Sequence, residues 1–530
     1  MQVLLIIFLS FFQFFDFWNF PLFSIAYLNV GTVISICLNV GQIWQLFTYY
    51  YRIRTRIKTI LQKLNSNIQI FVQYKHKKKR GFMMDIRSLS IEQYDAFLKQ
   101  TQMAYNFMQS TEFVRYTSKQ DHVKIFGGFQ NDELLIATYV ILRPALRLFK
   151  YGTSPREWIV KTPNLFCDES FIQEFAQGVA KQLKKEHAIV WMVESNTEYQ
   201  QHDQNGNVVE GSFCNEDYRQ MLKRCGFGLS PLWIGYDEAR QSRWVSWIDL
   251  QKNLPQSSQG FALPLQNGLE EYSWEDLLKE MAGNTRRSFQ KTDLPYIVTI
   301  RKNGNDDVNL DEFEALLECS AEKHNFGSGA KDHRLNILKS FGDHGYLSTA
   351  YLDVEEYDRF LQQKEIEFST QEAEALAVCE KMPNSKKKRN RLLEIQEQKT
   401  HNEKEIVALQ QLKQEDSRKM IPLASGIYLE TPSEMVYLFG GSDPRLARYM
   451  GPYANQKEMI RLALDHKLQR YNFWGISGHF KPEEDGYGVF FFKKNLGATV
   501  GEYCGEFYWI INSPIAKFFL KRVRPDLNQA

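Results

Sequence analysis

The chain has 530 residues, which is enough for two or three domains with sizeable cores. Its net charge of +2 is unevenly spread, because residues 1–83 hold ten Lys/Arg and one acid, which leaves residues 84–530 at −7. A globally basic nucleic-acid-binding protein is therefore excluded, and any contact with nucleic acid must be local. The seven cysteines are scattered without a CxxC pair, which argues against structural zinc and a disulfide framework and suits a reducing cytosolic setting.

Phe, Ile and Leu dominate the first 51 residues, which carry a single charged side chain. Segments 1–28 and 30–51 each have the length and hydropathy of a membrane span, and the basic segment 52–80 would then keep the following chain in the cytoplasm. The alternative is that translation starts at Met83 or Met84, because the globular pattern begins abruptly there. The sequence leaves both interpretations open, a membrane anchor or a mis-assigned start.

From Met84 onward the pattern alternates strands and helices, which is typical of a mixed α/β domain. Asn131-Asp132 is a good hairpin-turn dipeptide between two apolar segments. Apolar residues recur at helical spacing within 170–186, which predicts an amphipathic helix. The elements expected in this first domain are helices at 90–100, 112–118 and 170–186, and strands at 124–129, 134–142 and 188–193.

The same order of elements returns in the second half of the chain. A hairpin, a helix and a strand follow one another as before, which indicates a duplicated domain. The expected elements are helices at 312–323, 333–341 and 456–468, and strands at 346–353, 421–429, 435–439 and 471–474. In this second copy, a long insertion replaces the short turn of the first hairpin.

That insertion consists of roughly sixty-five mostly charged residues with apolar residues at every seventh position. Pro383-Asn384-Ser385 divides it in two, so the pattern predicts an antiparallel helical hairpin, a coiled-coil arm, over 355–419. Each limb of about 25 residues would project roughly 40 Å and reach a large partner. The predicted seam positions are Leu361, Phe368, Ala375 and Met382 on the first helix, and Leu392, Ile395, Ile406 and Leu409 on the second.

Two short motifs suggest chemistry. Gly440-Gly441 directly follows a predicted strand, where it either lets a substrate approach the backbone closely or forms a tight turn. Lys493 ends an aromatic run, where a desolvated ammonium would stabilise an oxyanion, and Glu502 and Glu506 follow closely enough to orient it. The plainer interpretation of Lys493 is a lysine that snorkels from an apolar strand or helix.

Two basic clusters stand out from the acidic body of the chain. Arg286 and Arg287 lie in a predicted helical segment, and guanidinium groups suit phosphate. The predicted tip of the arm carries Lys386, Lys387, Lys388 and Arg389, which suit an RNA backbone. The plainer interpretation of both clusters is a solvated surface, or for the tip a protein contact. No nucleophile–base set, zinc signature, P-loop or GxGxxG is readable, so a hydrolase, kinase or dehydrogenase has no support.

Residues from about 84 to 525 resemble the FemABX family of tRNA-dependent aminoacyl ligases, which build peptidoglycan cross-bridges. The matching motifs, in family order and spacing, are Phe107–Ser110, Asn284–Lys291, Ile421–Gly426, Tyr437–Ser442, Asn472–Gly478, Gly488–Lys493 and Glu502–Phe507. The resemblance implies an α/β (α+β) fold of two fused GNAT-like (acyl-CoA N-acyltransferase-like) domains, with the antiparallel coiled-coil arm inserted in the second. The predicted domains are the extension 1–83, a first domain 84–240, a second domain 241–354 plus 420–530, and the arm 355–419.

By the same resemblance, the donor is an aminoacyl-tRNA. The acceptor is the stem-peptide side-chain amine of lipid II or a similar lipid-linked precursor, met at the cytoplasmic membrane face without a cofactor or metal. An aminoacyl ester is already activated, so positioning of the amine is worth up to roughly 7–11 kcal/mol. The implied catalytic residues are Lys493, Glu506 and Tyr437. The implied substrate-binding residues are Gln109, Arg115, Lys119, Arg334, Gly440, Gly441, Ser442 and Tyr453, and the implied tRNA or phosphate contacts are Arg286, Arg287 and the four basic residues of the arm tip.

Two positions depart from the family pattern. The family lysine that follows the Gln-Ser pair falls on Thr117, and a substrate-binding arginine of the second domain aligns near Gly329. Either flanking cations substitute for them, or the chain is a catalytically degenerate member that binds tRNA or precursor without transfer. Acyl transfer from coenzyme A is a third option, which lacks a pyrophosphate-binding Gly-rich loop and does not explain the arm.

Overall fold

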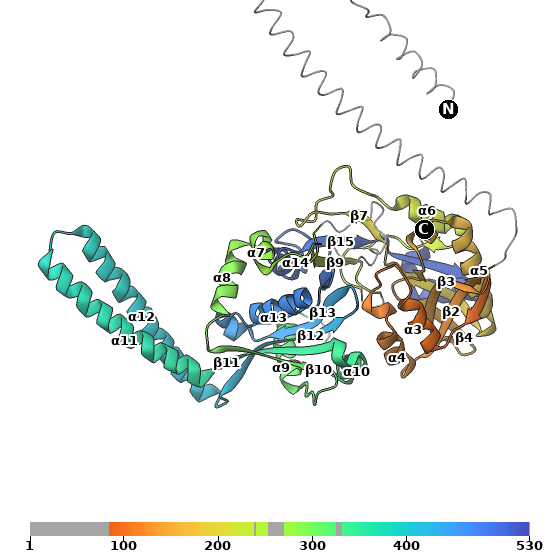
Figure 1. Ribbon diagram of the computed structural model, residues 1–530. Helices are drawn as coiled ribbons and strands as arrows, with labels where there is room; N and C mark the ends of the chain where they lie inside the picture. The colour runs from red at the N-terminus through yellow and green to blue at the C-terminus, as the bar shows by residue number, and fades with distance from the viewer. Residues whose placement is uncertain (1–83, 238–239, 253–269, 325–330, 529–530) are drawn as a thin grey trace, which may run out of the picture. The chain divides into compact units, whose positions relative to one another are not determined.

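Two mixed β-sheets, each flanked by helices, organise the chain in the computed structural model (Figure 1). The structure describes residues 84–237, 240–252, 270–324 and 331–528. Within these ranges no helix is both long and apolar enough to cross a membrane. The two membrane spans expected before residue 52, and the choice between an anchor and a mis-assigned start, lie outside the described residues.

The first sheet has the order β1-β2-β3-β4-β6-β16-β8, with β5 paired to β3. Its strands are β1 (Asp85–Ser88), β2 (His122–Gln130), β3 (Glu133–Leu146), β4 (Phe149–Ser154), β5 (Ile159–Val160), β6 (Ala188–Glu194), β8 (Gly228–Leu229) and β16 (Glu506–Ile510). The helices of this part are α3 (Ile91–Leu98), η1 (Phe107–Gln109), α4 (Thr111–Ser118), η2 (Pro163–Leu165), α5 (Glu169–Lys185), α6 (Glu216–Cys225), α15 (Ser513–Val523) and η5 (Pro525–Asn528).

The second sheet has the order β10-β11-β12-β13-β14-β9-β15-β7. Its strands are β7 (Glu198–Gln201), β9 (Trp244–Asp249), β10 (Ile297–Asn303), β11 (Gly345–Asp353), β12 (Met420–Glu430), β13 (Glu434–Ser442), β14 (Arg470–Ile476) and β15 (Thr499–Tyr503). Its helices are α7 (Trp274–Glu280), α8 (Gly283–Lys291), α9 (Asp311–His324), α10 (Lys331–Phe341), η3 (Gly342–His344), η4 (Pro444–Tyr449), α13 (Gly451–Asp465) and α14 (Tyr487–Asn495).

Local sequence explains most of these elements. The Ser90 side chain caps α3 in a capping box, and Asp168 accepts from two backbone N–H groups at the start of α5. Asn131 and Asp132 both have positive φ, 50° and 61°, which is the backbone that a two-residue hairpin turn requires. The hairpin between β2 and β3 is therefore confirmed where the turn dipeptide predicted it. The helix expected at 456–468 begins earlier, at Gly451, because Pro452 fits the first turn of a helix.

Both sheets contain the same run of strands. In the first, β1 to β4 pair antiparallel in sequence order, and β4 pairs parallel with β6 after the crossover through α5. In the second, β10 to β13 pair in the same way, and β13 pairs parallel with β14 after α13. The repeat read from the sequence is thus present in the sheet topology. The β11–β12 connection, which holds the arm, corresponds to the β2–β3 turn.

The two sheets also exchange strands. β16, near the end of the chain, lies between β6 and β8 in the first sheet, and β7, from the first half, pairs with β15 at the edge of the second. The division predicted between residues 240 and 241 therefore does not separate the two sheets strand by strand.

The inserted arm consists of α11 (Val354–Lys381) and α12 (Lys386–Glu415), which run side by side (Figure 1). Asp353 caps the first helix, and its carboxylate accepts from the Glu356 N–H. Most predicted seam positions are buried or half-buried, but Met382 is 53% exposed because it lies in the turn between the helices. At the base, Tyr357, Leu361 and Leu409 join a hydrophobic cluster with residues of β11 and β12, so the arm is packed onto the second sheet.

Candidate active site

A cavity of about 410 Å³ has Thr117, one of the positions that the sequence singled out, in its lining. Its wall combines η1, α4 and β3 with α10, β13 and the end of β14, so it draws on both halves of the chain. Aromatic and polar side chains both contribute to its lining, beside a few aliphatic ones. They include Phe107, Phe113, Tyr116, Thr117, Gln120, Asp121, Arg143, Glu194, Gln241, His333, Leu438, Phe439 and Trp474.

The charged groups of this cavity are predominantly acidic or already paired. Arg143 donates to Asp121 at 2.9 Å, which neutralises most of its charge locally. Burial raises the pKa of Glu194, whose carboxylate accepts from the Gln241 N–H at 2.8 Å. Burial also lowers the pKa of His333, which favours its neutral form. Such a lining suits a ligand with an amine more than one with several phosphates.

Trp474 forms one wall of the cavity in an unusual backbone conformation. Its φ is +63°, in the left-handed region, and it lies at a bulge where β14 pairs with β9. The Asn472 amide spans this bulge, because its oxygen accepts from the Trp474 N–H at 2.8 Å and its nitrogen donates to Glu434 at 2.9 Å. Phe107 packs edge-on against the indole ring, at 5.0 Å between centroids. Strained backbone held by several partners is a feature of functional sites.

Lys493, on α14, lies directly behind this wall. Its ammonium donates to the carbonyl of Gly475 at 2.6 Å and to that of Trp474 at 3.4 Å. The residue is only 5% exposed, and desolvation lowers its pKa from 10.5 to about 7. An ammonium has three donors, and the two carbonyls occupy two of them. A buried amine with this pKa can change its protonation state near neutral pH.

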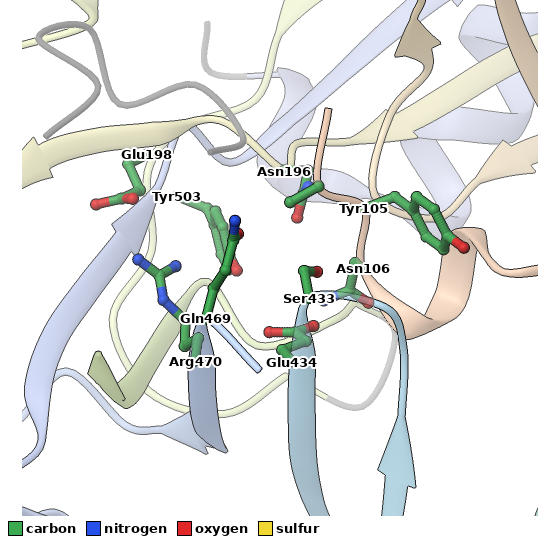
Figure 2. Close-up of a pocket in the computed structure, with 10 residues that line it drawn as sticks. Tyr105, Asn106, Asn196, Glu198, Ser433, Glu434, Gln469, Arg470 and Tyr503 are labelled. Atoms are coloured by element: carbon green, nitrogen blue, oxygen red, sulfur yellow. The ribbon is translucent and has the colours of Figure 1, made fainter. Parts of the chain in front are cut away.

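A second, smaller cavity of about 50 Å³ lies at the starts of β13 and β14 (Figure 2). Burial raises the pKa of Glu198 to about 7 and also raises the pKa of Glu434, one of whose carboxylate oxygens finds no hydrogen-bond partner among the described residues. Its polar lining also includes Asn106, Asn196, Ser433, Gln469, Arg470 and Tyr503 (Figure 2). Because Glu434 also binds Asn472, this cavity connects through one amide to the Trp474 bulge.

Comparison with known proteins places this geometry in a family. The model of the FemAB family matches residues 89–261 and 264–520. The chain belongs to the FemAB family. The resemblance found from the sequence motifs is thereby confirmed.

Two named relatives and one solved structure match most of the chain. Aminoacyltransferase FemA of Staphylococcus aureus strain bovine RF122 / ET3-1 is 26% identical over 436 residues, which cover 79% of this chain and 96% of the relative. Aminoacyltransferase FemA of strain MW2 gives the same identity and coverage. The crystal structure of FemX is 18% identical and matches with a TM-score of 0.62 over 82% of this chain and 99% of that chain, so the two share a fold. The expected mixed α/β fold with two sheets is confirmed.

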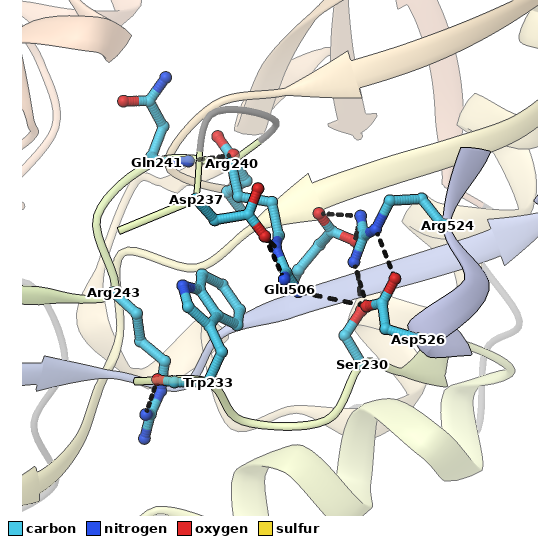
Figure 3. Close-up of polar contacts among 10 residues, drawn as sticks. Ser230, Trp233, Asp237, Arg240, Gln241, Arg243, Glu506, Arg524 and Asp526 are labelled. Carbon is cyan, nitrogen blue, oxygen red and sulfur yellow. Dashed lines mark hydrogen bonds and ion pairs between the residues drawn. The ribbon is translucent and has the colours of Figure 1, made fainter. Parts of the chain in front are cut away.

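Glu502 and Glu506, which the sequence analysis placed near Lys493, form hydrogen bonds with other residues. Glu506, on β16 of the first sheet, accepts from Arg524 at 2.5 and 2.8 Å and from Ser230 at 3.2 Å (Figure 3). Burial raises its pKa to about 7. Glu502 forms an ion pair with Arg243 and a hydrogen bond with the His202 ring. Their hydrogen-bond partners thus identify both carboxylates as anchors of the protein interior, and neither binds the Lys493 ammonium.

The residues on β13 and α13 serve mainly to pack the second sheet. Tyr437 stacks on Tyr428 at 5.1 Å, and burial raises its pKa to about 12. Gly440 and Gly441 lie within β13, not in a turn. A Cβ on Gly441 would collide with the backbone of α9, so this glycine permits close helix–strand packing.

Ser442 and Tyr453 also make protein contacts. The Ser442 N–H donates to the Ser320 hydroxyl at 2.8 Å, which ties β13 to α9. The Tyr453 ring packs against Phe289 and Phe492, at 6.1 and 5.4 Å between centroids. Neither side chain lines the 410 Å³ cavity.

None of the substrate-binding residues predicted in the first domain lines this cavity. Gln109 is buried and donates to the Arg156 carbonyl, and its side-chain oxygen accepts from the Asn106 N–H at 3.0 Å. Arg115 and Lys119 are exposed on α4. Thr117, between them, does line the cavity, and its hydroxyl donates to the Phe113 carbonyl.

In the second domain, Arg334 is buried and forms an ion pair with Glu314 of α9. Its neighbour His333 lines the cavity instead and contacts Tyr116 of α4 through their side chains. Gly329 lies outside the described residues.

The basic side chains predicted to contact phosphate differ in their exposure and in their hydrogen bonds to the protein. The Arg286 guanidinium donates to the carbonyls of Leu278, Lys279 and Met281, so it caps the end of α7. Arg287 is exposed on α8. The basic residues of the arm tip, Lys386, Lys387, Lys388 and Arg389, are exposed at the first turn of α12.

Several functional candidates escaped the sequence interpretation. Trp474 and Asn472 were noticed only as part of a family motif, and His333 and Glu434 were not singled out at all. The sole sequence signal for the bulge was the stretch Asn472-Phe-Trp-Gly475, in which glycine follows two aromatic residues within a strand. Among the described residues, no group of three or more His, Cys, Asp or Glu is placed to hold a metal ion.

Proposed function

We propose that this chain is an aminoacyltransferase that forms interpeptide bridges of peptidoglycan. It transfers an amino acid from aminoacyl-tRNA to the side-chain amine of the stem peptide in a lipid-linked precursor. Membership of the FemAB family and the name of the FemA relatives support aminoacyl transfer in general. The observation that carries the proposal here is Lys493, a buried lysine with a pKa of about 7 behind the Trp474 wall of the cavity.

The acceptor peptide is assigned to the 410 Å³ cavity. The Glu194 carboxyl group in its lining can accept a hydrogen bond from an amine, and the aromatic side chains cover the aliphatic part of an extended peptide. Because the one lining arginine is paired with Asp121, the cavity holds little free positive charge for phosphates. The flanking cations Arg115 and Lys119, exposed on α4, remain available for the phosphates of the precursor.

The reaction joins the neutral acceptor amine to the ester carbonyl of the aminoacyl-tRNA. The new C–N bond forms as the ester C–O bond breaks, and the proton lost by the amine ends on the terminal ribose hydroxyl. The third donor of the Lys493 ammonium is assigned to the oxyanion of the tetrahedral intermediate, since the carbonyls of Trp474 and Gly475 hold the other two. The exposed basic tip of the arm is assigned to the tRNA backbone.

This assignment makes the enzyme a peripheral protein of the inner membrane face, because its acceptor is attached to a lipid. Among the described residues, no helix could span a membrane. An extension that precedes residue 84 and anchors the chain would serve the same purpose.

The test is transfer of radiolabelled amino acid from a panel of charged tRNAs to lipid II by the purified chain. The Lys493→Met variant should lose about 10²–10³-fold in rate, the loss typical of one oxyanion donor. Lys494→Met is the matched control, because that neighbouring lysine lies over the Phe490 ring and bonds neither carbonyl of the bulge. Absence of transfer with every charged tRNA, together with intact precursor binding, would instead identify a noncatalytic binding module.

A further inference from the structure

Two large apolar side chains protrude into solvent where α15 meets the first sheet. Leu148, in the turn between β3 and β4, is 77% exposed, and Phe518, on α15, is 62% exposed. The turn and the helix are neighbours, because Leu146 and Phe149, on either side of the turn, pack into the same hydrophobic cluster as the inner face of α15. Exposed apolar groups of this size that lie close together mark interaction surfaces.

Unpaired cations accompany these apolar groups. Lys517, Lys521 and Arg522 are exposed on α15, and Arg147 is exposed beside Leu148. At about 100° per residue, the three helix cations and Phe518 fall within one arc of roughly 140°. No ion pair of these four cations occurs within the described ranges, and neither α15 nor the turn 146–149 contains an acid.

The helix that carries this face is firmly held. Ala516, Phe519 and Leu520 are buried on its inner side, and the Phe519 ring packs on Tyr151 at 5.4 Å. Directly after the helix, Arg524 binds Glu506 and Asp526, and Asp526 also pairs with Arg240 (Figure 3). Asp526, the first acid after α15 along the chain, is therefore already paired within the protein. The outward face of α15 is a fixed platform of positive charge with one protruding aromatic ring.

We propose that this platform, formed by Arg147, Leu148, Lys517, Phe518, Lys521 and Arg522, docks on an anionic lipid bilayer. Phe518 and Leu148 enter the headgroup region while the cations face anionic headgroups. The proposal rests on the proposed function only in that a lipid-linked acceptor requires the protein to reach a membrane. It gives that contact a location in the described part of the chain.

The chemistry of the platform favours a bilayer over the other large partner of the reaction. Nucleic acid would also be attracted by the four cations, but Leu148 has no π face on which a base can stack. An aliphatic side chain at the point of greatest exposure gains most from an apolar medium. The lack of any acid on the platform also disfavours a symmetric contact with a second copy, in which like charges would face each other.

The test measures binding of the full chain to vesicles by flotation, without tRNA or acceptor. Vesicles of phosphatidylcholine alone are compared with vesicles that contain phosphatidylglycerol. We expect the triple variant Lys517→Glu, Lys521→Glu, Arg522→Glu to bind the anionic vesicles at least about tenfold more weakly, with a smaller salt dependence. The matched control, Lys386→Glu, Lys387→Glu, Lys388→Glu, reverses equal charge on the exposed arm tip and should bind as the wild type does. Equal binding by all three proteins would overturn the proposal.

A second measurement locates the contact even if residues 1–83 also bind membranes. A photoreactive benzoylphenylalanine in place of Phe518 should cross-link to lipid, whereas the same group in place of Leu393, 56% exposed on the arm, should not. Protein–protein cross-links from position 518 would replace the bilayer by a second copy of the chain, and cross-links to added tRNA would replace it by RNA. Since none of these measurements involves turnover, failed docking and failed aminoacyl transfer are distinguishable.

Discussion

Replacing Lys493 by methionine tests the electrostatic state of the residue on which the mechanism depends. Burial lowers the pKa of Lys493 from 10.5 to about 7, so the folded protein disfavours the ammonium form. A shift of roughly 3.5 units corresponds to about 5 kcal/mol between pH values below 7 and above 10.5. Methionine has a similar volume and no proton to bind, so the variant lacks this dependence.

The sign follows from proton linkage. Between pH 7 and 10.5 the unfolded chain holds a proton on Lys493 that the folded chain has lost, so the stability of the wild type rises with pH across this window. Below pH 7 both states are protonated and the folded state bears the full cost of the buried charge. Relative to Lys493→Met, the wild type should therefore gain up to about 1.4 kcal/mol per pH unit, or roughly 2.3 kcal/mol between pH 7 and 9, because half of the amine is still protonated at pH 7.

Urea unfolding of both proteins at pH 6, 7, 8 and 9 measures this difference. Lys494→Met serves as the control, because this neighbouring lysine of the same helix lies over the Phe490 ring and bonds neither carbonyl of the bulge. In the same pH series, the rate of transfer by the wild type should rise up to about pH 7 and level off above it, because the loss of the Lys493 ammonium then offsets the growing fraction of neutral acceptor amine. The rate of transfer by Lys493→Met should keep rising with pH. A stability difference between wild type and Lys493→Met that stays constant from pH 6 to 9 would refute the buried-amine reasoning, whatever the activity of the variant.

Three further perturbations test the surroundings of the site. Asn472→Leu should lower the free energy of unfolding by about 2–4 kcal/mol, because it removes the donor to Glu434 and the acceptor of the Trp474 N–H. A loss below about 1 kcal/mol in urea unfolding would show that the amide does not hold the bulge. Gly441→Ala should cost at least about 2 kcal/mol through collision with α9, whereas Gly488→Ala, with no atom within 4 Å of the new Cβ, should be close to neutral; equal melting temperatures would contradict this packing. Replacing residues 367–399 by a short glycine-rich turn keeps the packed base of the arm, so the melting temperature should not change. The KM for aminoacyl-tRNA should rise about tenfold or more, because the basic tip is removed. An unchanged KM would mean that the tip does not bind tRNA.

Local sequence was sufficient wherever the deciding interactions lie within a few residues. The Asn131-Asp132 turn, the capped helix α5 and the two helices of the arm were all predicted, because turn dihedrals, caps and heptad seams depend on neighbours along the chain. The repeated hairpin, helix and strand order likewise survived as the shared topology of the two sheets. The aromatic run that ends at Lys493 left strand and helix open, and the structure makes it the helix α14.

The side chains that meet in the folded chain could not be inferred from local sequence patterns. Thr117, His333 and Trp474 line one cavity although each is more than 100 residues from the next along the chain. Glu506 lies in the first sheet because β16 crosses over to pair with β6. The low pKa of Lys493 is of the same kind, since desolvation depends on every element packed around the amine. Sequence spacing alone therefore associated Glu506 with Lys493, whereas strand exchange joined it to Arg524. The family, the arm and Lys493 could be recognised from the order of residues, because motifs and heptads are local. The cavity, the strained Trp474 and the partners of the buried charges depend on how distant strands pack.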